Sequence, residues 1–400
     1  MKVNTNPQKI KELLTRGVEE IIEKESLIKK LKSGKPLRIK FGIDPTAPDI
    51  HLGHAVPLRK LKQFQELGHK IILIIGDFTA TIGDPSGRSE TRKPLTKKEV
   101  TDNLKKYLSL ADKIIDIKKT EIHYNGEWFA KDGVSRLLEL SRAGSIQQVL
   151  RRADFRKRID EGYDISLLEA LYPLFQGYDS VKVGADVEIG GSDQKFNLLM
   201  GRRVQRHYKI PEQDIMTVPL LEGIDGVKKM SKSYGNYIAV DETPNDMFEK
   251  IMRLPDNLIA KYFLLCADKS EKEIQKIKTD MERGKLNPRD AKAKLAKEII
   301  SLYHRKPAAQ KAEKEFNRIF KEKKLPSEMP SIKITAKSIN VLNLLVKTKL
   351  ASSKAEGKRL IEQKGVKIDD EIQEDWRKNI PIKSGMIIQV GKRKFAKIIQ

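Results

Sequence analysis

Two basic segments of the sequence hold residue types that could bind a phosphorylated ligand. The first, His51-Leu-Gly53-His54, stands at the expected start of a helix. A helix N-terminus exposes unpaired N–H groups and the positive end of the helix dipole, so it favours phosphate. Histidines three residues apart share a helical face, where both could donate to phosphate oxygens. They could equally be surface or core histidines, and a zinc site is not expected because no further Cys or His cluster is in view.

The second segment is Lys229-Met-Ser-Lys232-Ser233, which follows the turn Gly223-Ile-Asp-Gly226. Two lysines and two hydroxyls on a glycine-flanked loop could clamp a leaving pyrophosphate and move with the reaction. A solvated basic loop would use the same residue types. The occurrence of both segments in one chain is much more specific than either segment alone.

Polar residues also share one face of a predicted helix further along the chain. Tyr172, Gln176 and Asp179 bring a phenol, an amide and a carboxylate together on that face. The combination suits an amphipathic polar ligand, although an ordinary helix with polar surface residues shows the same spacing. The segment Gly190-Gly-Ser-Asp193-Gln194 then offers a helix N-cap, a carboxylate that could accept from ribose hydroxyls, and an amide.

Alternating strand and helix patterns predict how these side chains are positioned. Residues 37–43 alternate as a strand, 52–67 as a helix ended by Gly68, and 70–76 as a strand buried on both faces. The pattern recurs as a strand over 181–189, a helix through Val204 and a strand over 215–221. Two such halves predict a doubly wound parallel-sheet α/β domain over roughly 36–225. Its ligand loops should follow Ile43, Ile75 and Ile189, at the carboxyl ends of the strands.

The charge balance points to a polyanionic partner. The chain has 400 residues, with 79 Lys and Arg against 55 Asp and Glu, and a net charge of +24. Residues 301–400 hold 24 of the basic and 11 of the acidic residues, so about +13 lies in the last quarter. This suits nucleic acid better than an anionic membrane, although a lysine-rich solvated surface would also account for it. The single cysteine, Cys266, and the lack of a signal-like or membrane-length apolar run predict a cytoplasmic protein without disulfides.

The two basic segments resemble the HIGH and KMSKS signatures of the class I aminoacyl-tRNA synthetases, with Leu52 in place of isoleucine. The resemblance implies that an amino-acid carboxylate attacks the α-phosphate of ATP, and that Mg²⁺ accompanies ATP without a dedicated protein site. It further implies that the nucleotide is bound, and the transition state stabilised, by His51, Gly53 and His54. The residues that would hold the β- and γ-phosphates are Lys229, Lys232 and Ser233. Such catalysis rests on positioning and charge stabilisation, with no covalent nucleophile.

Three further segments look like those of the tyrosyl-tRNA synthetases: the Tyr-Gln-Asp face, the Gly-Gly-Ser-Asp-Gln segment and Gly83-Asp84-Pro-Ser-Gly87. The similarity runs almost unbroken from about 38 to 253 and resumes near the C-terminus. It implies that Asp179 accepts a hydrogen bond from the phenol of L-tyrosine. The residues that would hold the α-ammonium group are Asp84, Tyr172 and Gln176. Gln194 would face the carboxyl end, Asp44 would lie beside the amino acid and the ATP, Thr46 would face the phosphates, and Asp193 the ribose.

One position departs from a well-known branch of that family. That branch has a tyrosine four residues before the Asp-Pro-Thr stretch, where it also touches the substrate hydroxyl, and here the position is Lys40. The chain is closer to a second branch, which has a long Asp-Phe-Thr-Ala-Thr-Ile-Gly-Asp-Pro loop. Phenylalanine would leave Asp179 buried without its partner, so no editing domain is needed, and no large insertion is seen.

The last residues resemble an S4 RNA-binding domain. Helical patterns over 339–347 and 353–363 precede strand-like segments over 366–368 and 386–390, with a hairpin at Gly391. The short helix pair would direct Lys354, Lys358 and Arg359 toward the RNA backbone, with tRNA(Tyr) as the implied partner. A solvated lysine-rich helix is the alternative. A homodimer is implied by the resemblance alone.

The expected organisation follows from these segments. An N-terminal helical segment over 1–35, with one amphipathic helix over 8–33, precedes a Rossmann-like catalytic domain over 36–241. An α-helical anticodon-side domain over 242–324, a linker over 325–337 and a small α+β S4-like domain over 338–400 should follow. Two rivals remain open. One is a tryptophanyl-tRNA synthetase, whose indole N–H could also donate to Asp179; the other is a non-catalytic RNA-binding paralogue, against which the intact histidines and lysines argue.

Overall fold

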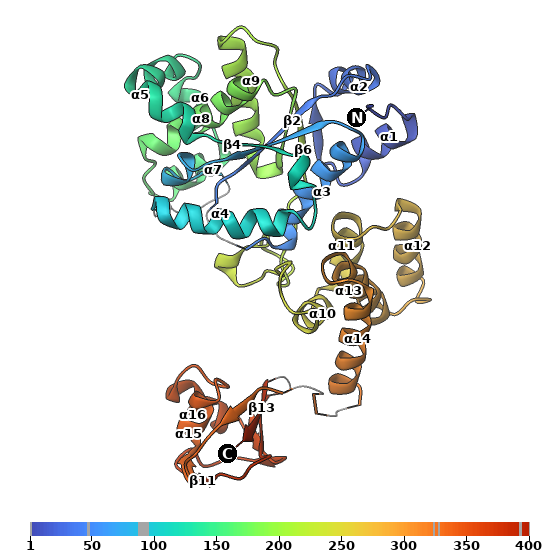
Figure 1. The fold of residues 1–400 in the computed structure, drawn as a ribbon, viewed down its shortest axis with the longest axis vertical. Helices are drawn as coiled ribbons and strands as arrows, with labels where there is room; N and C mark the ends of the chain where they lie inside the picture. Colours follow the sequence, from blue (N-terminus) through green and yellow to red (C-terminus); the bar gives the residue numbers. More distant parts are fainter. Residues whose placement is uncertain are drawn as a thin grey trace. The chain divides into compact units, whose positions relative to one another are not determined.

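The computed structural model describes residues 2–45, 49–86, 96–322, 325–326, 329–391 and 394–399. The chain divides into two compact units, Met1–Ala312 and Glu313–Gln400. Figure 1 shows the first unit as a central sheet with helices around it and further helices beyond, and the second as a small sheet with two helices. The α/β class and the small α+β domain predicted from the sequence are confirmed.

A six-stranded sheet forms the centre of the first unit, in the order β1-β6-β5-β2-β3-β4. The strands from β2 to β6 pair in parallel, and β1 pairs antiparallel with β6 at one edge. Their bounds are β1 (Glu20–Ile22), β2 (Arg38–Ile43), β3 (Lys70–Ile75), β4 (Glu121–Tyr124), β5 (Val187–Gly191) and β6 (Asp214–Val218).

From the two central strands, β2 and β5, the chain continues toward opposite edges of the sheet. Helix α3 (Leu52–Glu66) joins β2 to β3, whereas α9 (Lys195–His207) joins β5 to the strand on its other side, β6. Parallel crossovers are right-handed, so the two helices cover opposite faces of the sheet. The crevice of such a sheet opens where the direction reverses, here between the carboxyl ends of β2 and β5.

Two expectations for this unit are wrong. Residues 8–33 do not form one helix, because α1 (Pro7–Thr15) and α2 (Lys24–Lys32) are separated by β1, which pairs with the exposed edge of β6. Gly17 and Glu23, both with positive φ, end and restart the helical path. The strand expected from Val181 begins only at Val187. Residues 181–183 instead form the last turn of α8 (Leu167–Val183), which Gly184 ends in the left-handed region.

The remaining helices of the first unit surround this sheet or follow it in the chain. Between β3 and α8 lie α4 (Lys97–Ala111), α5 (Gly126–Ser141), α6 (Ile146–Leu150) and α7 (Ala153–Asp160), with short 3-10 turns at Thr79–Thr81 and Ile117–Lys119. A 3-10 turn at Ser192–Gln194 lies between β5 and α9. After β6 come α10 (Pro244–Met252), α11 (Ile259–Cys266), α12 (Glu271–Glu282) and α13 (Pro288–His304), with 3-10 turns at Lys232–Tyr234 and Asp256–Leu258. Helix α14 (Lys306–Phe320) begins in the first unit and ends in the second.

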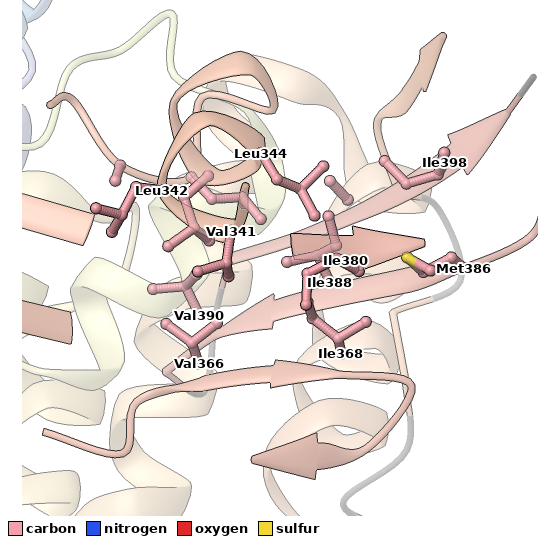
Figure 2. Packing of buried hydrophobic residues seen from close by; sticks show 14 of the residues in the cluster. Val341, Leu342, Leu344, Val366, Ile368, Ile380, Met386, Ile388, Val390 and Ile398 are labelled. Carbon is pink, nitrogen blue, oxygen red and sulfur yellow. The ribbon is translucent and has the colours of Figure 1, made fainter. Parts of the chain in front are cut away.

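The second unit is built around a five-stranded sheet in the order β10-β9-β12-β13-β7, with the pair β11-β8 beside it. Its elements are β7 (Ser331–Lys333), β8 (Ser338–Asn340), α15 (Val341–Lys347), α16 (Lys354–Glu362), β9 (Val366–Ile368), β10 (Glu371–Ile372), β11 (Asn379–Pro381), β12 (Ile387–Val390) and β13 (Lys394–Ile399). Figure 2 shows Val341 and Leu344 of α15 packed over Val366, Ile388 and Ile398 of the sheet. The linker expected over 325–337 therefore ends earlier, because β7 pairs in parallel with β13 and Ile334 is buried in this core.

Candidate active site

A cavity of 580 Å³ opens at the carboxyl ends of β2, β3 and β5, where the topology places the crevice. Segments far apart in the sequence line it, and most of the predicted site residues are among them: Asp44, His51, Gly53, His54, Asp84, Tyr172, Gln176, Asp179, Asp193, Gln194, Lys229 and Ser233. Lys232 lies beside the cavity without lining it. Thr46 is outside the described residues.

The two histidines lie together at the start of α3. His51 is the N-cap residue, and its Nδ1 accepts a hydrogen bond of 3.3 Å from the backbone N–H of His54. The two rings are stacked, with 3.7 Å between centroids. Burial lowers the pKa of His51 to about 2. His54 is more exposed, and the desolvation of its ring in the cleft, with the charge of Lys229, lowers its pKa as well. Both rings are therefore neutral at pH 7, and Nε2 of His51 carries the proton that it can donate.

Backbone contacts join the histidines to the chain that follows the lysine loop (residues 229–233). The N–H of Leu52 donates to the carbonyl of Ile238 at 2.9 Å, and His51 forms an isolated bridge with Ala239. A Cβ built on Gly53 would lie 3.5 Å from Cβ of Met230, so the loop packs directly on the start of α3. The two basic segments thus lie on the same side of one cleft.

The lysine loop carries its two ammonium groups to carboxylates at the rim of the cavity. Lys229 pairs with Asp193 at 3.0 Å, and Lys232 pairs with Asp49. The base of the loop is held by Asn236, whose Oδ1 accepts from the N–H of Ser231 at 2.8 Å and whose Nδ2 donates to Asp225 at 2.9 Å. Both pairs are partly exposed, so a polyphosphate could exchange with the carboxylates at little cost.

Asp179 closes the inner end of the cavity. Its carboxylate accepts from Nε1 of Trp128 at 2.9 Å and from Nδ2 of Asn125 at 3.4 Å, and it is buried. Burial raises the pKa of Asp179 to about 7, against the positive charge of Lys40 and the two hydrogen bonds. Asn125 and Trp128 were not predicted from the sequence. Asn125 directly follows β4, so its place at a carboxyl strand end was the available signal.

Tyr172 and Asp44 form the next part of the wall. The hydroxyl of Tyr172 donates to Oδ2 of Asp44 at 2.8 Å, and the hydroxyl of Thr79 donates to Oδ1 at 2.7 Å. Burial, with the adjacent negative charge of Asp44, raises the pKa of Tyr172 well above its usual value, so the phenol stays protonated. A Cβ on Gly76 would lie 2.0 Å from Asp44, so only glycine fits at the end of β3.

The mouth of the cavity is organised by a network around Asp84. Its Oδ2 accepts from Gln194 at 2.6 Å, and its Oδ1 from the backbone N–H of Ser86 at 2.9 Å. Asn197 donates to Oε1 of Gln176 at 3.1 Å and accepts from Arg152 at 2.9 Å. Asn197 and Arg152 were also missed, because their role appears only when α7 and α9 meet in space.

Lys40, which stands where one branch of the family has a tyrosine that touches the substrate hydroxyl, does not line the cavity. Its side chain is fully buried, and its ammonium group donates to Glu188 at 2.8 Å, to the hydroxyl of Ser180 at 2.8 Å and to the carbonyl of Gln176 at 2.7 Å. Glu188 thus neutralises the charge of Lys40, and the pair lies behind the residues of α8 that line the cavity.

The predicted RNA-binding residues all belong to α16 of the second unit. Lys354, Lys358 and Arg359 are exposed, and the ammonium group of Lys358 lies 4.7 Å from the ring centroid of Trp376. Within the part of the chain that the structure describes, no group of three or more His, Cys, Asp or Glu could hold a metal ion. No described helix has the length and apolarity needed to cross a bilayer.

Comparison with known proteins yields matches over nearly the whole chain. Residues 32–321 match the family model for class I tRNA synthetases (W and Y), and residues 321–398 match the model for the C-terminal domain of tyrosine–tRNA ligase. A tyrosine–tRNA ligase of Carboxydothermus hydrogenoformans is 50% identical over 97% of both chains, and one of Thermotoga maritima is 47% identical over 98% of both. A tyrosyl-tRNA synthetase of Archaeoglobus fulgidus, solved with L-tyrosine, has a similar fold (TM-score 0.62, 24% identity, 76% of this chain and 99% of that one).

Proposed function

This chain belongs to the tyrosine–tRNA ligases of class I, and we propose that the cleft described above is where it activates L-tyrosine. The enzyme joins L-tyrosine to ATP, releases pyrophosphate and transfers the tyrosyl group to the 3′ end of tRNA(Tyr). The single observation that carries the assignment of the site is the meeting of the two basic segments, tied by the Leu52–Ile238 hydrogen bond, beside a slot that ends at Asp179.

The tyrosine slot runs inward along α8. The phenol donates to the carboxylate of Asp179, which Trp128 and Asn125 hold in place. The residues proposed to hold the α-ammonium group are Asp84, Tyr172 and Gln176. Gln194, bonded to Asp84, faces the carboxyl end, and Asp44 lies between the amino acid and the ATP. The slot therefore has acceptors at both ends of the substrate, where tyrosine has its donors.

In the first step, an oxygen of the tyrosine carboxylate forms a bond to the α-phosphorus, and the bond from that phosphorus to the bridging oxygen breaks. The neutral His51 and His54 donate N–H groups to the developing charge on the α-phosphate. Gly53 lets the nucleotide approach the backbone, Asp193 accepts from the ribose hydroxyls, and Thr46 remains a predicted phosphate contact. The group that holds the leaving β- and γ-phosphates is Lys229, Lys232 and Ser233. Mg²⁺ would accompany the ATP phosphates and neutralise part of their charge, without a dedicated protein site.

Tyrosine-dependent exchange between ATP and labelled pyrophosphate tests this function directly. Exchange is expected with tyrosine and not with phenylalanine, which has no donor for Asp179. It is not expected with tryptophan, because the relatives that match nearly the whole chain are tyrosine–tRNA ligases. Exchange with tryptophan would point to the sister synthetase. No exchange with any of the three, by an enzyme that still binds tRNA, would point to a non-catalytic RNA-binding protein.

Contact between the second unit and tRNA(Tyr) forms part of the proposal, and α16 is the proposed surface. Reversing the charges of Lys354, Lys358 and Arg359 to glutamate should raise the KM for tRNA about tenfold or more and leave pyrophosphate exchange unchanged. The slope of the logarithm of the tRNA binding constant against the logarithm of the salt concentration should become about 2–3 less steep. Each lost phosphate contact reduces this slope by slightly less than one. Binding measured over a series of salt concentrations checks this.

A matched control reverses three exposed lysines of the first unit, Lys113, Lys118 and Lys119. This control should leave the KM for tRNA near the wild-type value. Equal losses in the two triple variants would mean that overall charge, and not the α16 surface, attracts the tRNA.

We also propose that the enzyme is a homodimer, which works in the cytoplasm where translation takes place. Large apolar side chains lie exposed on α8 and on two helices that pack against it, α5 and α6. They include Val134 and Leu138 of α5, with 73% and 60% of their surface exposed, and Leu167 of α8 with 78%. Ile146 and Leu150 of α6 add to this apolar surface. Figure 1 shows α5, α6 and α8 near one another in the first unit. An apolar patch of this kind marks a protein contact, and a second copy of the chain supplies the same apolar patch.

Replacing Leu138 and Leu167 by aspartate should convert the dimer to a monomer, because two charges would be buried at each copy of the contact. The dissociation constant should rise about a hundredfold or more. Light scattering after size-exclusion chromatography measures the change. Ile372→Asp, at an exposed apolar residue of the second unit, is the control and should remain dimeric. A wild-type protein that is monomeric at all concentrations would remove the proposal.

A further inference from the structure

A fully buried ion pair lies directly behind the tyrosine slot. Lys40 on β2 and Glu188 on β5 are register partners on neighbouring parallel strands, so their side chains leave the same face of the sheet, toward α8. The ammonium nitrogen and Oε1 are 2.8 Å apart, and neither side chain has measurable contact with solvent. Burying two charges costs several kcal/mol per ion, and an apolar pair of similar volume is often at least as stable. Stability alone therefore gives little reason for this pair.

The pair is bonded to the residues that form the slot. Lys40 donates to the carbonyl of Gln176 and to the hydroxyl of Ser180, one helical turn apart on α8. Glu188 accepts from the amide of Gln176 at 3.1 Å and from Ser180 at 3.2 Å. Because Asp179 lies between these two anchored residues, the pair determines where the turn of α8 that carries Asp179 stands relative to the sheet.

We propose that Lys40 is a specificity-determining positioning residue, which with Glu188 holds Gln176 and Asp179 in the geometry that reads the phenol of tyrosine. Lys40 can have this role only if the slot binds tyrosine as proposed above. It occupies the position where one branch of the family has a tyrosine that touches the substrate hydroxyl. Lys40 itself does not touch the substrate and acts through Gln176 and Asp179, which line the slot.

The charges around Asp179 make the proposal testable by pH. Lys40 from β2 and Glu188 from β5 are the charged groups that act on it most, while Asp44, at the end of β2, and Tyr172 of α8 lie further along the slot. Trp128 and Asn125 contribute neutral donors. Burial raises the pKa of Asp179 to about 7; Lys40 opposes this rise and Glu188 adds to it. Only the ionised carboxylate is a pure acceptor for the phenol, so tyrosine activation should fall as pH drops through this pKa.

The experiment compares Lys40→Met, Glu188→Gln and the double variant in the full-length enzyme. The kcat/KM for tyrosine in pyrophosphate exchange is measured over roughly pH 6–9. Lys40→Met should move the acid limb to higher pH by about one unit or more, whereas Glu188→Gln should move it to lower pH. The double variant should move it in the direction of Lys40→Met but less far. At pH 7, Lys40→Met should raise the KM for tyrosine about tenfold, with the KM for ATP unchanged and the preference over phenylalanine reduced.

Arg158→Met is the matched control, because Arg158 forms another buried ion pair, with Glu169 at 2.8 Å, that does not line the cavity. It should lower the unfolding temperature without moving the acid limb. If Lys40→Met does not fold, the opposite shifts of Glu188→Gln and the double variant decide the question. The role of Lys40 would be overturned if the acid limbs of the variants stayed at the wild-type pH. It would also be overturned if the limb moved in the same direction in Glu188→Gln as in the variants that lack Lys40. A wild-type enzyme that does not activate tyrosine would instead overturn the proposed function.

Discussion

Replacing Lys232 by alanine is expected to lower the turnover of tyrosyl-adenylate formation by about 10²–10³-fold, with little change in the KM for tyrosine. The ammonium group pairs with Asp49 at the cavity rim and is partly exposed, so it is free to exchange that carboxylate for the β- and γ-phosphates. Removing one preorganised donor to developing charge typically costs this much. Single-turnover measurement of adenylate formation reports the chemical step alone.

Lys228→Ala is the control for this loop. Lys228 is exposed and does not itself line the cavity, although its ammonium group lies 4.8 Å from the ring centroid of Tyr234, which does. Its loss should leave the rate within about twofold of the wild type. A normal adenylate rate in purified Lys232→Ala would remove the clamp from the mechanism.

Asp179→Asn should lower the kcat/KM for tyrosine about a hundredfold, chiefly through a higher KM for tyrosine, and leave ATP binding unchanged. Trp128 and Asn125 both direct donors at this position, so an asparagine can offer only its oxygen to them and cannot also accept strongly from the phenol. A lost charge-assisted hydrogen bond at a buried site is worth about 1.5–3 kcal/mol, and every 1.4 kcal/mol is about tenfold. Activation of phenylalanine should stay at its low wild-type level, so the preference for tyrosine should fall by the same factor.

Asp214→Asn tests whether any buried carboxylate would give this result. Asp214 is buried at the start of β6, pairs with Lys30 at 3.0 Å and does not line the cavity. Its replacement should leave the kinetics for tyrosine unchanged. If Asp179→Asn kept the wild-type preference for tyrosine, the phenol would have to bind elsewhere.

The parts of the fold that were predictable are those with a strong period or a clear stop signal. The continuous apolar run of β3 and the helix ended by Gly68 define a βαβ unit, whose handedness and switch point then follow from general topology. The strand β1 was not predictable in this way. Its three residues continue the apolar spacing of a helix, and only the unpaired edge of β6, formed nearly 200 residues later, makes them a strand.

The residues of the candidate site were predictable to different degrees for the same reason. Motifs local in sequence, such as the pair of histidines or the face of α8, reveal the residues that line the cavity. The side chains that hold these residues come from other elements: Trp128 and Asn125 for Asp179, Thr79 for Asp44, and Glu188 for Gln176. No spacing rule connects such partners, because they meet only after the sheet has brought its strand ends together. The family and function inferred from the motifs are confirmed, while the roles of individual site residues remain predictions.

A crystal structure of this enzyme with an unreactive analogue of tyrosyl-adenylate tests the central claim most directly. We predict that the phenol oxygen lies within hydrogen-bond distance of Asp179, and that the group replacing the α-phosphate lies beside His51 and His54. An analogue bound outside the cleft, or bound in it with the phenol away from Asp179 and the linker away from the start of α3, would contradict the account.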